Sequence, residues 1–267
     1  LATGALMLIV VCLSVGLMGF VYRLEEERAF RRLHEAAADL SGDIVQLVTR
    51  DQEQLTVVAD LIARLDDIKS DEAAQLLARY ESHGMIARLG VLYPGDTLLL
   101  SSGRLMDTGG ALSFEEEAAK GVHISDREQD LVNPDEMILR VCVPVRREGE
   151  TAAMLLGAID LSSLPELWRP EAFEGRASIY VVDGATGETL VDTWHGSLGN
   201  FLEMGTREMK AGFTQDQLTE EMMAGKPGYV AFVSRTIGDN LYLYYEPVPV
   251  NQWRIALSVP EQVVFED

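Results

Sequence analysis

Arginine, carboxylate and tyrosine side chains that are able to bind a small ligand lie between residues 93 and 160 of this 267-residue sequence. The candidates are Tyr93, Arg104, His123, Asp126, Arg140 and Asp160. Arg140 is the most informative, because it interrupts the apolar run MILRVCV, and a charge in such a strand must be paired, solvated or functional. Its alternation with Leu139 and Val141 also fits a strand with one solvated face. The sequence thus predicts binding chemistry here and leaves the role of Arg140 open.

Three of these candidates also have a simple structural explanation. His123 begins a short strand-like run, and a lone histidine is more often a structural or surface residue than a ligand. Asp126 can shape a turn in SDRE, and Asp160 can cap a helix that begins at LSSLPEL. Both interpretations stay open for each residue.

A second group of candidates lies near the end of the chain, in LYLYYEPVPVNQWRIALSVPE. Strand alternation places Tyr242, Tyr244 and Glu246 on one face, and Trp253 on the apolar face of the next strand. We expect Trp253 in the core. Tyr242 and Tyr244 are secondary pocket candidates, on a more polar face that a pocket or a helical insertion can meet.

Sequence signatures of enzymes are missing. The sequence contains no Gly-rich phosphate loop ending in Lys-Ser or Lys-Thr, no H-E-x-x-H, no C-x-x-C and no nucleophile elbow. Its 4 histidines are scattered, without metal-ligand spacing. We therefore expect a binding protein without catalytic residues, metal or cofactor.

The charge of the chain restricts its partners. There are 43 acidic against 22 basic residues, a net charge of −21. The electrostatic field of so negative a chain repels phosphate backbones, so a nucleic-acid partner is not expected.

The 2 cysteines, Cys12 and Cys142, lie in very different contexts, which makes a disulfide framework improbable.

The first 22 residues carry no charge. As a helix they extend about 33 Å, enough to cross a hydrocarbon core of about 30 Å. We expect a transmembrane helix over residues 1–22, with Tyr22 as an interfacial anchor. A cleaved signal peptide is the alternative, although no small-x-small cleavage site follows. Because the chain starts with Leu, we also expect it to be part of a longer protein.

A long helical pattern follows over residues 23–80. Apolar residues recur three and four apart, and Gly42 alone interrupts residues 24–66, so one helix of about 60 Å is expected. Asp51 falls where a core residue belongs. The spacing suits a stalk that forms a homodimer, and equally a helix packed against its own domain.

From about residue 84 the pattern alternates in the manner of strands. Hairpins are predicted around PGD and REGE, and a second block repeats the same plan with turns at GDN and VNQ. The fold class is α+β, with two antiparallel five-stranded sheet modules in tandem. The expected divisions are a transmembrane helix (1–22), a stalk helix region (23–80), a distal module (81–160), a linker (161–175), a proximal module (176–260) and an approach to a second membrane helix (261–267).

This arrangement resembles the extracytoplasmic double-Cache sensor family, whose modules have PAS-like sheets. The segments that carry the resemblance are GVHISDREQD, RVCVPVRREGETAAMLLGAIDLSSL and LYLYYEPVPVNQWRIALSVPE. It implies that the distal module holds a small ligand between its sheet and the loops above. Asp160 resembles the family's final Asp, which pairs with a ligand ammonium group. Many amino-acid-sensing members of the family carry an Arg, a Trp and a Tyr upstream of this Asp. No Trp occurs in residues 1–167, so the aromatic and arginine part of that motif is not matched here.

The resemblance also implies a function. We expect the extracytoplasmic part of a bacterial membrane receptor, in which ligand binding biases a cytoplasmic output. The main expectation for that output is a GGDEF diguanylate cyclase, with histidine kinase and chemoreceptor as alternatives. A membrane-anchored hydrolase and a protein-interaction module are the rival classes. The ligand itself is not identified by the sequence.

Overall fold

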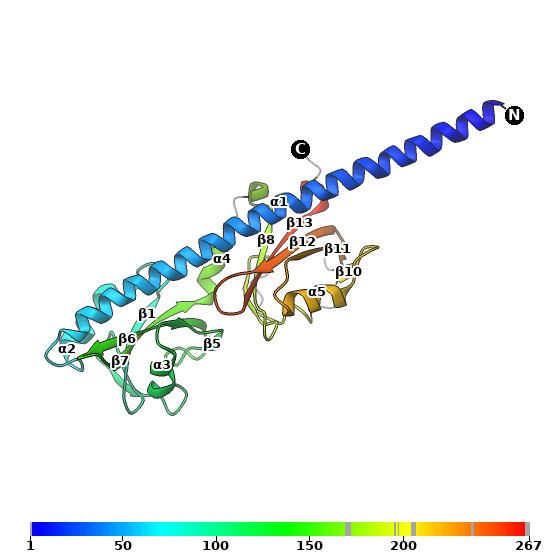
Figure 1. Cartoon of the computed structure of the whole chain (residues 1–267). Coiled ribbons are helices and arrows are strands. Elements are labelled where there is room, and N and C mark those ends of the chain that lie inside the picture. The colour runs from blue at the N-terminus through cyan, green and yellow to red at the C-terminus, as the bar shows by residue number, and fades with distance from the viewer. Residues whose placement is uncertain are drawn as a thin grey trace.

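The computed structural model describes residues 2–168, 172–194, 196, 198–203, 207–235 and 238–264, with the side chains of residues 2–11 excluded. One helix, α1 (Ala2–Ala63), forms the spine of the molecule. Figure 1 shows that it runs past two sheets in succession and that its N-terminal part projects beyond them. The helix ends at Ala63, and α2 (Asp71–Tyr80) follows it as a separate helix.

Among residues described with their side chains, no helix carries an apolar run long enough to cross a membrane. The span expected over residues 1–22 falls only partly within that set, because residues 1–11 lie outside it.

The first sheet lies in the part of the chain for which the distal module was predicted. It has seven strands in the order β3-β2-β1-β7-β6-β4, and β5 also pairs with β6. Its strands are β1 (Arg88–Tyr93), β2 (Thr97–Leu100), β3 (Leu105–Asp107), β4 (His123–Ile124), β5 (Glu128–Gln129), β6 (Met137–Arg147) and β7 (Glu150–Asp160). A short helix, α3 (Phe114–Lys120), lies between β3 and β4.

The second sheet lies in the part of the chain for which the proximal module was predicted. It has six strands in the order β10-β11-β12-β13-β8-β9. The strands are β8 (Ser178–Asp183), β9 (Thr189–Asp192), β10 (Arg207–Met209), β11 (Gly228–Ser234), β12 (Asn240–Pro247) and β13 (Trp253–Pro260). The helices of this half are α4 (Leu164–Leu167), α5 (Gln215–Met223) and α6 (Glu261–Val264), and the 3-10 turns are η1 (Leu161–Ser163) and η2 (Ala172–Gly175).

Two antiparallel sheets in an α+β chain agree with the predicted tandem arrangement. The predicted count of five strands for each sheet was wrong. The additional strands are short pieces such as β4, β5 and β10, of two or three residues each, and so short a run carries no detectable alternation.

The hairpins follow from local turn chemistry. The β6–β7 turn contains Glu148 and Gly149, with φ of 52° and 89°. Positive φ at both central residues gives a turn whose twist matches the strands on either side. The REGE turn was therefore correctly predicted, and it joins the two longest strands of the first sheet.

One face of each sheet packs against α1. The buried stripe of the helix runs from Phe30 through Leu33, Ala37, Leu40, Ile44, Val48, Leu55 and Val58 to Ile62. These residues belong to one hydrophobic cluster that also includes residues from both sheets, such as Val141 and Ile255. At Gly157 of β7, an added Cβ would lie 2.9 Å from Leu55 Cδ1, so glycine permits this close approach. Helix α1 thus shares its core with both modules.

Asp51 interrupts this stripe and is fully buried, at 0% exposure. Its Oδ2 accepts a hydrogen bond from the Met85 amide at 3.0 Å. Its Oδ1 has no hydrogen-bond donor within the described residues, although Arg50 Nε lies 3.6 Å away. Burial raises the pKa of the Asp51 carboxyl, and the Met85 hydrogen bond and the Arg50 charge offset this only in part.

Asp51→Asn is expected to stabilise the chain at neutral pH. Because the folded pKa exceeds the unfolded value of about 3.9, the stability that Asp51 contributes is present below that value and lost as pH rises through the folded pKa. Urea denaturation should show a gain of roughly 1 kcal/mol at pH 8 that shrinks toward pH 4. Asp60→Asn, at an exposed site of α1, is the control and should change little. An equal gain at both pH values would show that ionisation of Asp51 is not the cause.

Candidate ligand-binding site

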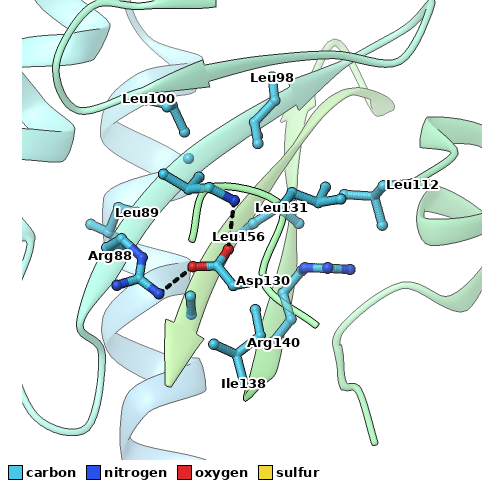
Figure 2. A pocket seen from close by; sticks show the side chains of 13 residues that line it. Arg88, Leu89, Leu98, Leu100, Leu112, Asp130, Leu131, Ile138, Arg140 and Leu156 are labelled. Atoms are coloured by element: carbon cyan, nitrogen blue, oxygen red, sulfur yellow. Dashed lines mark hydrogen bonds and ion pairs between the residues drawn. The ribbon is translucent and has the colours of Figure 1, made fainter. Parts of the chain in front are cut away.

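A cavity lies on the face of the first sheet that is turned away from α1. Its polar walls are Arg88, Asp130 and Arg140, and apolar walls such as Leu98, Leu112 and Leu156 surround them. Figure 2 shows Arg88 and Asp130 directed toward each other across this space. The cavity has a volume of about 40 Å³.

Strand register explains why two arginines line the same cavity. Ala158 of β7 pairs with Arg88 of β1 on one side and with Arg140 of β6 on the other. Neighbouring strands are about 4.8 Å apart, so the two arginines flank Ala158 on the same face. The side chain between the two arginines is therefore only a methyl group.

Arg88 is tied to two carboxylates. Its Nη2 donates to Asp130 Oδ2 and, at 2.8 Å, to Glu136 Oε2. Burial lowers the pKa of Arg88, but its hydrogen bond to Glu136 and the charges of both carboxylates outweigh burial and raise it. Its Nε is buried and has no acceptor among the residues described. One directed donor of Arg88 is therefore left for a further acceptor.

Arg140 is buried, with 6% of its surface exposed. Its Nη2 lies 3.0 Å from Glu128 Oε1. Burial raises the pKa of Glu128, while the Arg140 charge and a hydrogen bond from Ser125 oppose the shift. The charge in MILRVCV is thus paired and also faces the cavity, which excludes the solvated-face interpretation.

The loop of residues 130–136 closes the cavity. Asp130 Oδ1 accepts from the Val132 amide at 3.0 Å, and the Asp130 amide donates to the Glu136 carbonyl at 3.0 Å. Leu131 and Val132 of this loop line the cavity. The Asp130 carboxylate therefore joins the loop to Arg88 on β1.

Two predicted site residues lie away from the cavity. Tyr93 is fully buried on the face of β1 that contacts the helices, where its hydroxyl donates to the Ile68 carbonyl. Arg104 is exposed between β2 and β3, with Nη2 3.9 Å from Met106 Sδ. Neither residue lines the cavity.

Asp160 and His123 have local partners. The Asp160 carboxylate accepts from the Ser162 amide at 2.9 Å and caps the turn that follows β7. Asp160 therefore acts as the cap that the sequence analysis gave as one of its two interpretations. His123 Nε2 lies 2.9 Å from Glu117 Oε2, in a cluster next to the cavity.

Asp126 connects the two modules. Its Oδ1 accepts from the indole Nε1 of Trp253 and from Asn251 Nδ2, each at 3.1 Å. Next to it, Arg127 forms an ion pair with Glu188, with Nη2 2.6 Å from Oε1. The segment SDRE is therefore a module-to-module contact, in which Trp253 is fully buried as predicted.

Tyr242 and Tyr244 face α1. Tyr242 is fully buried, lies 5.2 Å from the Phe30 ring and has its hydroxyl 3.1 Å from that of Tyr22. Tyr244 is 5.1 Å from the His34 ring. The expectation that a pocket or a helical insertion meets this face was wrong, because α1 covers the face instead. Tyr22, expected as an interfacial anchor, donates to Glu261 Oε1 at 2.8 Å.

Sequence reasoning missed Arg88 and Asp130. Arg88 begins the strand RLGVLY, and its importance depends on the strand pairing that places it beside Ala158. Asp130 lies in a loop without regular periodicity. The available signal was Arg140 alone, a charge inside an apolar strand.

No family profile and no curated protein matches this chain. Solved structures match over nearly their full length. The ligand-binding domain of the Pseudomonas aeruginosa PAO1 amino acid chemoreceptor PctB, in complex with L-Arg, has a TM-score of 0.66 at 14% identity, with 90% of this chain and 99% of that chain covered. The sensory domain of the Campylobacter jejuni chemoreceptor Tlp3 with isoleucine bound has a TM-score of 0.67 at 11% identity, covering 92% and 98%.

A third match is the extracellular domain of soHK1S-Z6, a protein assigned as a histidine kinase, with a TM-score of 0.66 at 16% identity over 91% and 98% of the two chains. The chain has the fold of these extracellular sensor domains.

Asp126→Ala is expected to destabilise the chain by roughly 1–2 kcal/mol, because the buried indole N–H of Trp253 loses its acceptor. The change is measured by urea denaturation followed through tryptophan fluorescence. Asp126→Asn retains an acceptor oxygen and is the matched control, expected near wild type. If both variants lose equal stability, the Asp126 charge rather than this hydrogen bond matters.

Proposed function

We propose that the chain is the extracytoplasmic, ligand-sensing part of a membrane receptor and that the distal cavity binds its ligand. The observation that carries the proposal is the pair Arg88 and Arg140 on either side of Ala158, with Asp130 opposite and apolar walls around them. The shared fold of chemoreceptor and histidine kinase sensor domains supports it.

The polar groups indicate the class of ligand. A ligand carboxylate is able to accept from the free Arg88 Nε donor, and Arg140 supplies a second positive charge on the other side of Ala158. A ligand ammonium group is able to pair with Asp130. The leucines of the wall suit a small apolar side chain. A small apolar amino acid, or a related carboxylic acid, fits these groups, and two of the matched chemoreceptor domains hold amino acids.

Binding requires the 130–136 loop to open. A cavity of about 40 Å³ holds only a few water molecules, because one water needs about 10–15 Å³. A ligand carboxylate would replace Asp130 and Glu136 as acceptors of Arg88, releasing the loop from β1. Ligand binding and loop position are then coupled, and the shift is limited by the ligand's differential affinity for the two arrangements.

The output domain is proposed from the comparisons. They favour a histidine kinase or chemoreceptor over the diguanylate cyclase expected from the sequence, since sensor domains of the first two types match the chain. Residues 81–160 and 176–260 serve as distal and proximal modules in this proposal, joined by residues 161–175. A homodimer formed through the stalk helix is part of the same proposal.

Small apolar amino acids are expected to stabilise the whole chain. A thermal-shift panel of amino acids, followed by titration calorimetry, tests this, and saturation at 100 times Kd adds about 2.7 kcal/mol. For L-isoleucine as the probe, 3-methylpentanoic acid and 2-methylbutylamine each lack one charged group and should bind at least tenfold more weakly. Arg140→Met should cause a similar loss by removing a positive charge of the cavity wall.

The exposed Arg104 provides the matched control for that titration. Arg104→Met removes the same charge outside the cavity and should bind like wild type. Asp130→Asn should weaken the amino acid but not the acid that lacks the ammonium group. No stabilisation by any member of the panel, or equal losses in Arg104→Met and Arg140→Met, would contradict the proposed site.

Residues 1–22 are proposed to cross the membrane, with the remainder outside the cytoplasm, because this run is uncharged and long enough for the hydrocarbon core. The expressed chain should stay in the membrane pellet after an alkaline carbonate wash. Replacing Leu13 and Leu17 by Arg should release it, since each charge costs about 2.5–3.5 kcal/mol in a membrane helix. Leu105→Arg, at an exposed site of the distal module, should not. Release of the wild-type chain would contradict the anchor.

A further inference from the structure

A second cluster of reactive side chains lies beside the cavity, on the same side of the first sheet. It consists of Glu117 on α3, His123 on β4 and Cys142 on β6. His123 and Cys142 are cross-strand partners, and Glu117 approaches them from the helix above. The three ligand atoms lie within 4.8 Å of one another.

One carboxylate oxygen is the meeting point of the cluster. Glu117 Oε2 is 2.9 Å from His123 Nε2 and 3.3 Å from Cys142 Sγ. Lys120 Nζ lies 2.6 Å from the other oxygen, Oε1, and so leaves Oε2 to the cluster. In a tetrahedral zinc site, bond lengths of about 2.0–2.3 Å separate such ligand atoms by roughly 3.3–3.5 Å. The two distances at Glu117 Oε2 need to lengthen by only a few tenths of an ångström, and the third pair, His123 Nε2 and Cys142 Sγ, lies within 4.8 Å.

His123 already has the orientation that a metal ligand needs. Its Nδ1 lies 2.9 Å from the Gly121 carbonyl oxygen, which accepts a hydrogen bond from that nitrogen. This contact favours the tautomer whose Nε2 lone pair points into the cluster. In metal sites the second ring nitrogen of a histidine ligand is commonly held by such an acceptor.

The surroundings are enclosed but reachable. Cys142 is fully buried and free, and Glu117 is 5% exposed. The His123 side chain is 17% exposed and provides the route from solvent. Three enclosed side chains from separate elements form a preorganised set.

We propose that Glu117, His123 and Cys142 bind a divalent transition metal ion, with Zn²⁺ as the best fit. Thiolate, imidazole and carboxylate are the ligands that zinc prefers, and three protein ligands leave a fourth position open. Binding transfers the Cys142 thiol proton to solvent, so that the thiolate coordinates the ion. The proposal goes beyond the small-molecule function, because it makes the distal module responsive to a metal.

The position of this site connects it to the cavity. Cys142 pairs with Leu156 of the cavity wall, and it lies two residues beyond Arg140 on the same face of β6. An ion held here would fix α3 and β4 against β6. The open coordination position would face a water molecule or a donor atom of a ligand.

Cobalt(II) is the probe for this proposal, because a bound thiolate gives a sulfur-to-cobalt charge-transfer band. The whole chain, treated with a chelator and a reductant, is titrated with CoCl₂ and then with ZnCl₂. We expect the band together with visible bands of tetrahedral cobalt, saturation at one ion per chain, and displacement by zinc. Cys142→Ser should lose the charge-transfer band, and His123→Gln should weaken binding at least tenfold.

Cys12→Ser is the matched control, because Cys12 is the other free cysteine of the chain. It should bind cobalt like wild type. Circular dichroism establishes that each variant is folded, and His123→Gln, at a partly exposed strand, keeps the test valid if Cys142→Ser does not fold. Absence of the charge-transfer band in wild type, or its survival in folded Cys142→Ser, overturns the proposal. Loss of the band in Cys12→Ser overturns it as well.

Discussion

Burial of one face of each sheet beneath α1 is the constraint on which the rest of the structure depends. Each sheet has two faces that need cover, and one helix supplies the cover for one face of both. The apolar contacts of this shared core contribute on the order of 25 cal/mol for each Å² removed from water. Neither module has a complete core without the helix.

The position of α1 determines where the charged side chains of the first sheet lie. Because α1 occupies one face of the first sheet, charged groups gather on the other, under loops and the short helix α3. Arg88 and Arg140 are separated there by a single small residue, and their carboxylate partners come from segments outside the central strands. The second sheet buries its own far face under α5 with apolar residues such as Leu218 and Met222. The two modules therefore share an architecture and differ in what their outer faces hold.

The sequence predicted the features that depend on residue spacing along the chain, and it missed those that depend on which strands pair and on which elements pack together. The stripe of α1 and the β6–β7 turn follow from spacing and turn chemistry. Arg140 was recognised because its charge interrupts an apolar strand. The meeting of Arg88 with Arg140 depends on the strand order β1-β7-β6, which no local pattern encodes. Alternation likewise assigned Tyr242 and Tyr244 to one face without indicating that α1 covers it.

The stripe on α1 has a mechanical consequence. Sliding the helix by one residue toward its N-terminus would require an advance of about 1.5 Å and a rotation of about 100° to restore contact. Residues of the stripe would then be replaced by their neighbours, for example Phe30 by Arg31, Leu40 by Ser41 and Leu55 by Thr56. Since the same stripe contacts both sheets, such a slip would disrupt both cores at once. Helix α1 therefore behaves as a stiff rod of fixed register, whose low-energy movements are small tilts and translations shorter than one residue.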